Sequence, residues 1–329
     1  WQKTTPTRAI VSLNGLWNFF PVTTPETGRM IPPRNSGWGF FKVPGIWPGM
    51  GNRKTQPGNS SAFYGLNSER FAGLNPSALT SAWYRRTMKI PRSWNGKKIE
   101  LEITMLQTGG RIFIDGKKAG DMFFPGGRLD ITESIVPGKE HELVILVSAI
   151  ASRTGDSVFM APDRAHKAAR IISNRGITGD VYLRVEPQGE AITDSHIITS
   201  YRRKTITFDT GIVRGDGEYY IEADISWKGR IVKRMKSELF QMRSSNRPGR
   251  FRFSGNWIAR NLWDTDTPEH IYTANIRLKN KDGVTLDEFL PQSFGFREFW
   301  IDGRNFMLNG SVIHLRSLCS SAMRDGAAH

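Results

Sequence analysis

The sequence contains one cysteine in 329 residues and has no long run of apolar side chains. Cys319 alone excludes a disulfide within the chain, and its surroundings show no spacing typical of a metal site. A membrane-spanning helix needs about 20 apolar residues, so none is predicted, and the first residues lack the order of a signal peptide. The compartment stays open, with a periplasmic or secreted location favoured.

Acidic residues are fewer than basic ones. The sequence has 31 Asp and Glu residues and 46 Lys and Arg residues, which gives a net charge of +15. Such an excess suits nucleic acid, an anionic membrane or an acidic polysaccharide. The basic residues are scattered over strand-like pieces such as TSYRRKT (199–205) and KGRIVKRMK (228–236), which indicates solvated sheet faces. No nucleic-acid motif accompanies them, so we expect neither nucleic-acid nor membrane binding.

Helical periodicity is also scarce, and HKAARII (166–172) is the best short candidate. Strand patterns dominate instead. In KKIELEITM (97–105) apolar and charged residues alternate, which predicts a sheet with one buried face. LVILV (143–147) is apolar throughout, which predicts a strand covered on both faces. Turn pairs such as Asp115-Gly116 and Asn309-Gly310 separate the strands, so the sequence predicts an all-β chain.

A segment rich in Gly, Asn, Ser and Pro, at 48–81, is too polar for a buried strand, and loops of this length are usually functional rims. Two further breaks, at 186–192 and 289–293, read as domain boundaries.

The order of the segments resembles glycoside hydrolase family 2 along nearly the whole chain. NLWDTDTPEHIYTANIRL (261–278) is similar to the Leu-Trp-x-x-x-x-Pro-x-x-Tyr signature of that family's immunoglobulin-like module. The other matching segments are SLNGLWNF (12–19), KVPGIWP (42–48), AWYRRTMKIPRSWNGKKIELEI (82–103), RIFIDGKKAGD (111–121), RLDITESIVPGKEHELVILV (128–147), RGITGDVYLRVEP (175–187) and SFGFREFWIDGRNFMLNGSVIHLRS (293–317).

This resemblance implies three parts. Residues 1–188 are expected to form a galactose-binding-like jelly-roll sandwich that binds sugar. Residues 189–292 are expected to form an immunoglobulin-like β-sandwich. Residues 293–329 are expected to form the entry hairpin and first strand of an incomplete (β/α)₈ barrel.

The resemblance also implies a β-glycosidase that acts on galactose, glucuronic acid, mannose or a related sugar without a cofactor. Its two catalytic carboxyl groups belong to a barrel, which needs about 200 residues or more. The few dozen residues after 291 are too few, so we expect no catalytic residue here and no activity of this chain alone. RSLCSSAM (316–323) keeps only the Arg of the family's Arg-Gly-x-Asn-x-His-Glu pattern, which leaves the parent's substrate open. Homo-oligomers are compatible with the resemblance.

Four residues are candidates for substrate binding. Asn75 lies in the long loop where some family members present an Asn to the sugar, and Trp47 precedes that loop. Arg170 and Arg175 stand where several members have an Asp, and their guanidinium groups would favour an acidic sugar. The alternatives are a turn-opening Asn, a core Trp and ordinary surface arginines. His166 and His196 lack metal-ligand partners, and no metal site is predicted.

A second functional reading is a stand-alone carbohydrate-binding or adhesion module for acidic glycans. It would use the same domains and the same positive charge, and it would differ from the first reading in having no hydrolytic domain.

Overall fold

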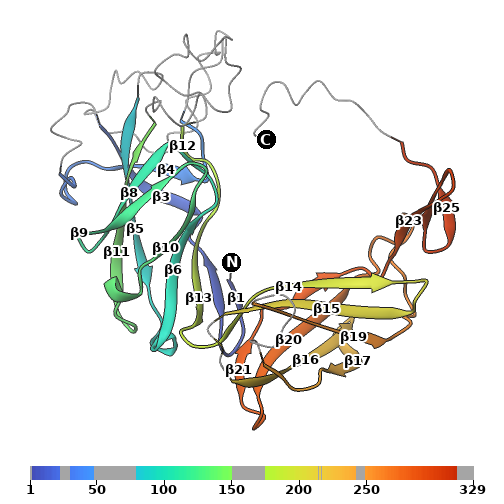
Figure 1. Cartoon of the computed structure of the whole chain (residues 1–329). Coiled ribbons are helices and arrows are strands. Elements are labelled where there is room, and N and C mark those ends of the chain that lie inside the picture. Colours follow the sequence, from blue (N-terminus) through green and yellow to red (C-terminus); the bar gives the residue numbers. More distant parts are fainter. Residues whose placement is uncertain are drawn as a thin grey trace. The chain divides into compact units, whose positions relative to one another are not determined.

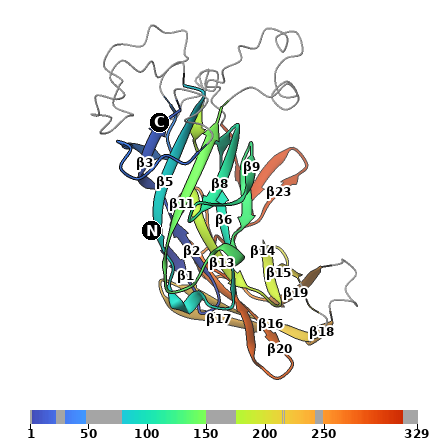
Figure 2. The same ribbon diagram turned by 90° about the vertical axis from the view of Figure 1, so that its left-hand side faces the viewer.

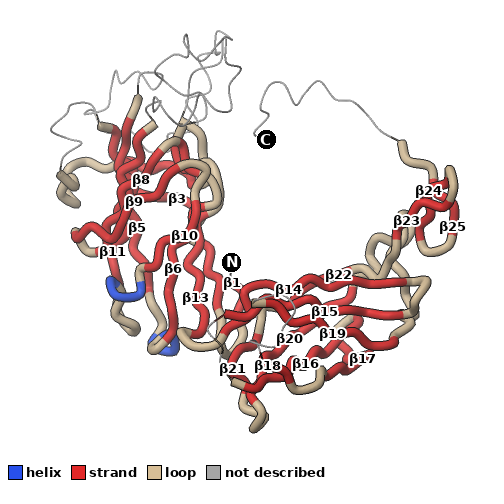
Figure 3. Tube along the Cα trace, viewed as in Figure 1, coloured by secondary structure: helices blue, strands red, loops and turns tan. Residues whose placement is uncertain are grey.

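Strands make up nearly all regular structure in the computed structural model (Figures 1 and 3). The structure describes residues 2–22, 30–47, 79–149, 175–213, 215, 217–241 and 249–316. Within these ranges the only helices are two 3₁₀ turns, Arg92–Trp94 and Thr132–Ser134. The all-β prediction is therefore confirmed. The chain divides into two compact units, Trp1–Gln188 and Gly189–His329.

The first unit is a sandwich of two antiparallel sheets. One sheet has the order β1-β2-β13-β6-β10 and the other β4-β3-β5-β11-β8-β9, with a small β12-β7 ribbon beside them. Figure 2 shows β5, β11, β8 and β9 side by side in that order. The strands are β1 (Gln2–Thr4), β2 (Ala9–Ser12), β3 (Gly15–Pro21), β4 (Gly39–Val43), β5 (Ser81–Lys89), β6 (Lys97–Ile103), β7 (Leu106–Gln107), β8 (Gly109–Ile114), β9 (Lys117–Phe123), β10 (Gly127–Asp130), β11 (Glu140–Ser148), β12 (Gly176–Ile177) and β13 (Val181–Pro187).

Strand β6 has the two-sided character predicted from its alternation. Ile99, Leu101 and Ile103 are buried in the core between the sheets. Glu102, on the other face, accepts hydrogen bonds from the side chains of Arg128 and Arg184 on the neighbouring strands. The period of two thus gives one apolar face and one face of cross-strand ion pairs.

Strand β11 is covered on both sides, as its apolar run predicts. Ile145 and Val147 join the core between the sheets. Val144 points the other way, into a second cluster with Phe20 and Trp83 on the outer face of the six-stranded sheet. Each fully buried side chain of this size contributes about 1.5–3 kcal/mol through the hydrophobic effect.

The second unit is also a two-sheet sandwich. Its sheets are β14-β15-β19 and β17-β16-β20-β21, with β18 beside β16 and β22 beside β20. The core contains the rings of Phe208, Tyr219, Tyr272 and Phe296. The strands are β14 (Ala191–Ser200), β15 (Thr205–Val213), β16 (Glu218–Trp227), β17 (Arg230–Lys236), β18 (Phe240–Gln241), β19 (Arg250–Asn256), β20 (Tyr272–Asn280), β21 (Thr285–Glu288) and β22 (Gln292–Phe294).

A three-stranded meander follows in the same unit: β23 (Phe299–Asp302), β24 (Asn305–Leu308) and β25 (Ser311–Ile313). The Asn309-Gly310 pair joins its last two strands with both residues at positive φ, 50° and 91°. Asp115-Gly116 does the same between β8 and β9, at 48° and 79°. Asn, Asp and Gly adopt this backbone region more easily than other residues, so the predicted turn chemistry is confirmed at both positions.

Candidate functional site

Two of the four predicted substrate-binding residues lie within the described structure. Asn75 and Arg170 fall outside the described residues, together with the predicted helix 166–172 and most of the long loop. Trp47 and Arg175 are described, and they lie side by side: the backbone N–H of Trp47 donates to the carbonyl of Arg175 at 2.9 Å.

Trp47 is a core residue, with 1% of its surface exposed. Its indole Nε1–H donates to the hydroxyl of Tyr84 at 2.6 Å, inside the aromatic core of the first unit. Burial raises the pKa of Tyr84 well above its ordinary value, although the hydrogen bond from Trp47 acts in the opposite direction. A Cβ on Gly176 would lie 2.9 Å from Trp47 Nε1, so the close packing depends on a glycine there.

Arg175 is fully buried as well. Its Nη1 donates to the carbonyl of Leu79, and burial lowers the pKa of its guanidinium group. The side chain therefore ties the start of β12 to residue 79, at the border of the long loop. A direct contact of Trp47 or Arg175 with sugar stays a prediction, and in the described structure both side chains point into the protein.

The β12-β7 ribbon and the residue that follows β12 provide two acceptors that sequence reasoning missed. Gln107 Oε1 and Thr178 Oγ1 are enclosed, and neither has a hydrogen-bond partner among the described residues. Gln107 pairs with Gly176, the neighbour of Arg175, and Thr178 follows directly after β12. Enclosed acceptors of this kind are suited to a hydroxyl or a water molecule. Nothing in the sequence marks these two residues.

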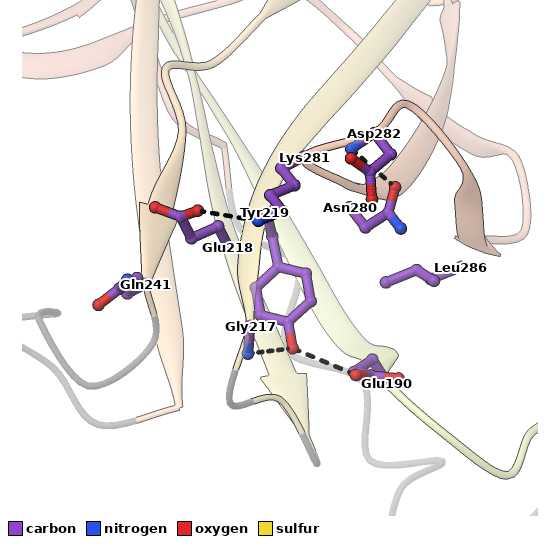
Figure 4. Close-up of a pocket in the computed structure, with 9 residues that line it drawn as sticks. All are labelled: Glu190, Gly217, Glu218, Tyr219, Gln241, Asn280, Lys281, Asp282 and Leu286. Carbon is purple, nitrogen blue, oxygen red and sulfur yellow. Dashed lines mark hydrogen bonds and ion pairs between the residues drawn. The ribbon is translucent and has the colours of Figure 1, made fainter.

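The second unit has an open pocket of about 440 Å³ (Figure 4). On its floor, the Tyr219 hydroxyl accepts a hydrogen bond from Gly217 N–H at 2.7 Å and donates to Glu190 at 3.2 Å. Lys281 faces Glu218 at 4.0 Å. The ring of Tyr219 is buried, so this floor presents hydroxyl and carboxylate groups without an aromatic face. None of the residues predicted from the sequence lines this pocket.

Two further polar residues, Asp180 and His196, have structural partners. Asp180 accepts hydrogen bonds from Asn14 Nδ2 at 2.7 Å and from the Tyr182 hydroxyl at 2.9 Å. His196 is exposed and lies 3.3 Å from Asp194. Across the described ranges no group of three or more His, Cys, Asp or Glu side chains could hold a metal ion. Over the same ranges no helix has the length and apolar character to cross a membrane.

Comparison with known proteins gives matches in both sequence and structure. No protein-family model matches the chain. A β-galactosidase from Thermoanaerobacter pseudethanolicus is 23% identical over 259 residues, which are 72% of this chain and 31% of that protein.

Solved structures match almost the whole chain. A family 2 glycosyl hydrolase from Bacteroides cellulosilyticus has a TM-score of 0.63 at 18% identity, over 92% of this chain and 38% of its own. A β-glucuronidase from Ruminococcus gnavus, solved with D-glucuronic acid, has a TM-score of 0.63 at 16% identity, over 95% and 50%. A putative β-galactosidase from Bacteroides fragilis has a TM-score of 0.61 at 21% identity, over 93% and 44%. The chain thus spans half or less of each of these relatives, and the solved structures establish a shared fold.

Proposed function

From the relationship to glycoside hydrolase family 2, we propose that the chain is the non-catalytic N-terminal part of an enzyme that hydrolyses β-linked glycosides. The bond-breaking carboxyl groups would belong to a separate barrel domain, and this chain alone would be inactive. The motif order and the match in fold support the family relationship. The observation that supports a separate barrel domain is an exposed apolar surface on the β23–β25 meander.

One face of the β23–β25 meander is apolar and open to solvent. Phe299 and Ile301 are 50% and 65% exposed on β23, and Phe306 is 38% exposed on β24. Ile301 pairs with Phe306, which pairs with Ile313 on β25, so these side chains share one face. Contiguous exposed apolar surface is typical of a site that another polypeptide covers. A domain that follows the meander would cover this apolar face.

We propose that the sugar binds beside Trp47 and Arg175 in the first unit, and we call this part of the unit the rim. Trp47 and Arg175 would support it from inside, while Asn75 and Arg170 remain the proposed direct contacts. The enclosed acceptors Gln107 Oε1 and Thr178 Oγ1 support a hydroxyl-binding role for the same rim. An acidic sugar agrees with the net charge of +15 and with Arg170 as a proposed direct contact.

The experiment compares this chain with the product of the longer reading frame that contains it. Both are assayed with p-nitrophenyl β-galactoside, β-glucuronide and β-mannoside. We expect the longer protein to hydrolyse at least one of them and this chain to hydrolyse none. If the complete gene product cleaves no β-glycoside, or if this chain cleaves one, the proposal fails.

The high positive charge supports a second candidate, a carbohydrate-binding or adhesion module for acidic glycans. It predicts salt-sensitive retention on polygalacturonate, together with no hydrolysis by the complete gene product. Sedimentation of that product would also test whether it assembles as a homo-oligomer.

A further inference from the structure

Among the described residues, the most exposed aromatic side chain is Phe123, with 70% of its surface open to solvent. It ends β9, the edge strand of the six-stranded sheet in the first unit. The preceding residue, Met122, belongs to the core between the sheets. Because side chains alternate along a strand, Phe123 lies on the outer face of that sheet.

The strand register places small and polar residues in line with this ring. Phe123 pairs with Gly109 on β8, Gly109 with Ser148 on β11, and Ser148 with Ser81 on β5. Residues that are directly opposite in antiparallel strands share a face, so these four form one line across β9, β8, β11 and β5, the strands seen together in Figure 2. We call them the Phe123 row. At about 4.8 Å per strand spacing, it spans roughly 14 Å.

The ring of Phe123 is held against the sheet by its surroundings. A Cβ on Gly109 would lie 3.4 Å from Phe123 Cδ1, so one side of the ring rests over the glycine. The chain after it is fixed by two backbone hydrogen bonds, from Phe124 N–H to the Thr108 carbonyl at 2.8 Å and from Gly126 N–H to the Phe123 carbonyl at 2.9 Å. A backbone held in this way limits the conformational entropy that is lost when a ligand stacks on the ring.

Hydrogen-bonding groups lie along the row and beside it. Ser81 Oγ and Ser148 Oγ are 3.2 Å apart and are bonded to each other, which leaves acceptor capacity on both hydroxyls and one remaining O–H donor on the pair. Arg111 is two residues beyond Gly109 on the same face of β8, and its side chain bonds to Asp121 at 3.3 Å. Lys118 bonds to the same carboxylate at 2.5 Å, so this neighbouring group has a net charge of +1.

We propose that the Phe123 row binds the pyranose rings of an extended β-linked polysaccharide. A pyranose has an apolar C–H face and a polar edge of hydroxyls. The C–H face would stack on Phe123, and the hydroxyls would bond to Ser148, Ser81 and the Arg111–Asp121 pair. A row of this length along one end of the sheet suits an extended chain better than a single small ligand. Binding is a property of this chain alone, so it is independent of the hydrolysis proposed for a longer protein.

The test measures binding of this chain to immobilised β-1,4-galactan, galactomannan and the β-linked acidic polymer polymannuronate by biolayer interferometry, at physiological salt and at about 0.5 M salt, where exposed charges are screened. We expect binding to at least one polysaccharide that persists at high salt. Phe123→Ala should weaken it about tenfold, the effect of losing one stacked ring. Phe299→Ala is the matched control, because Phe299 is an exposed phenylalanine outside the Phe123 row, with 50% of its surface open to solvent, and it should bind like the wild type.

A second variant tests the proposal separately, in case Phe123→Ala weakens binding only by disturbing the fold. Ser148→Ala removes one hydroxyl with little change in shape and should also weaken binding, with unchanged thermal unfolding in both variants. The proposal is overturned if the wild type binds none of the three polysaccharides. It is equally overturned if Phe123→Ala binds like the wild type, if Phe299→Ala loses as much, or if all binding disappears at high salt.

Discussion

Asn309 and Glu298 are joined in both directions. The backbone N–H of Asn309 donates to the Glu298 carbonyl, and the backbone N–H of Glu298 donates to Asn309 Oδ1, each at 3.0 Å. Asn309 Nδ2 also donates to the carbonyl of Trp263 at 2.8 Å. One asparagine thus ties the meander to the loop before β20.

Asn309→Ala should therefore destabilise the second unit. The change removes a donor and an acceptor at a residue that is 9% exposed, and it places alanine at a φ of 50°. Loss of buried hydrogen bonds of this kind corresponds to about 1–3 kcal/mol in the free energy of unfolding, measured by urea denaturation. Asn305→Ala, in an exposed position of β24, is the control and should change it by less than about 0.5 kcal/mol. Equal effects of the two changes would contradict this role.

Glu298 also makes the stability of the second unit depend on pH. Partial burial pushes the pKa of Glu298 up. Hydrogen bonds from Arg202 and Ser200 outweigh it and hold the pKa below its ordinary value of 4.5. A lowered pKa in the folded state stabilises the protein above pH 4.5, and this contribution is lost as the pH falls through the folded value.

The difference in unfolding free energy between wild type and Glu298→Gln should therefore shrink below pH 4.5. Other carboxylates with lowered pKa values, such as Asp194, affect both proteins alike and cancel in the difference. Arg202→Gln removes the same interaction from the other side and should reduce the pH dependence in the same way. A difference that stays constant between neutral pH and pH 3 would exclude Glu298 as the source.

Local pattern was sufficient for the fold class and for individual strands. The alternation in β6 and the apolar run of β11 depend only on which faces are buried, and period and composition report this directly. The turns at Asp115-Gly116 and Asn309-Gly310 depend on backbone preferences of the residues themselves. The order of motifs added the resemblance to glycoside hydrolase family 2, which no single segment carried.

The candidate site was harder to predict from the sequence than the fold, because it depends on pairings between residues that are distant in the chain. Trp47 meets Tyr84 across 37 positions, and the sequence alone does not show that the indole points inward. Gln107 lies beside Gly176, the neighbour of Arg175, only through the β12-β7 pairing. Nothing in the sequence distinguishes Phe123 from other strand residues. Only the strand register shows that Gly109 and Ser148 lie in line with it.

Trp47→Phe distinguishes a supporting residue from a sugar contact. The change removes the donor to the Tyr84 hydroxyl and leaves a small cavity in the aromatic core. We expect a loss of about 2–3 kcal/mol in the free energy of unfolding without any sugar present. Trp38→Phe is the control, because Trp38 is only half-buried and its indole donates to the Pro33 carbonyl near the surface, so its loss should be smaller. Unchanged stability of Trp47→Phe would favour a direct role in binding.

The apolar face of the meander makes a prediction about this chain in isolation. Phe299 and Ile301 stand next to each other on that face, and the ring of Phe299 stacks on Phe306 with centroids 5.8 Å apart. Dyes such as ANS bind exposed apolar surface, so the double variant Phe299→Ser/Ile301→Lys should show weaker ANS fluorescence than the wild type. Because both side chains are at least half exposed, the free energy of unfolding should change by no more than about 0.5 kcal/mol.

The control for this measurement is Leu16→Lys, which removes a side chain of comparable exposure, 57%, from the first unit. It should leave the ANS signal close to that of the wild type, because dye binding requires contiguous apolar surface rather than one exposed side chain. The unaltered longer gene product should show a weaker ANS signal than this chain, since the proposed following domain would already cover the face. A strong ANS signal from that longer protein, reduced by the same double variant, would show that the face stays open and that nothing packs against it.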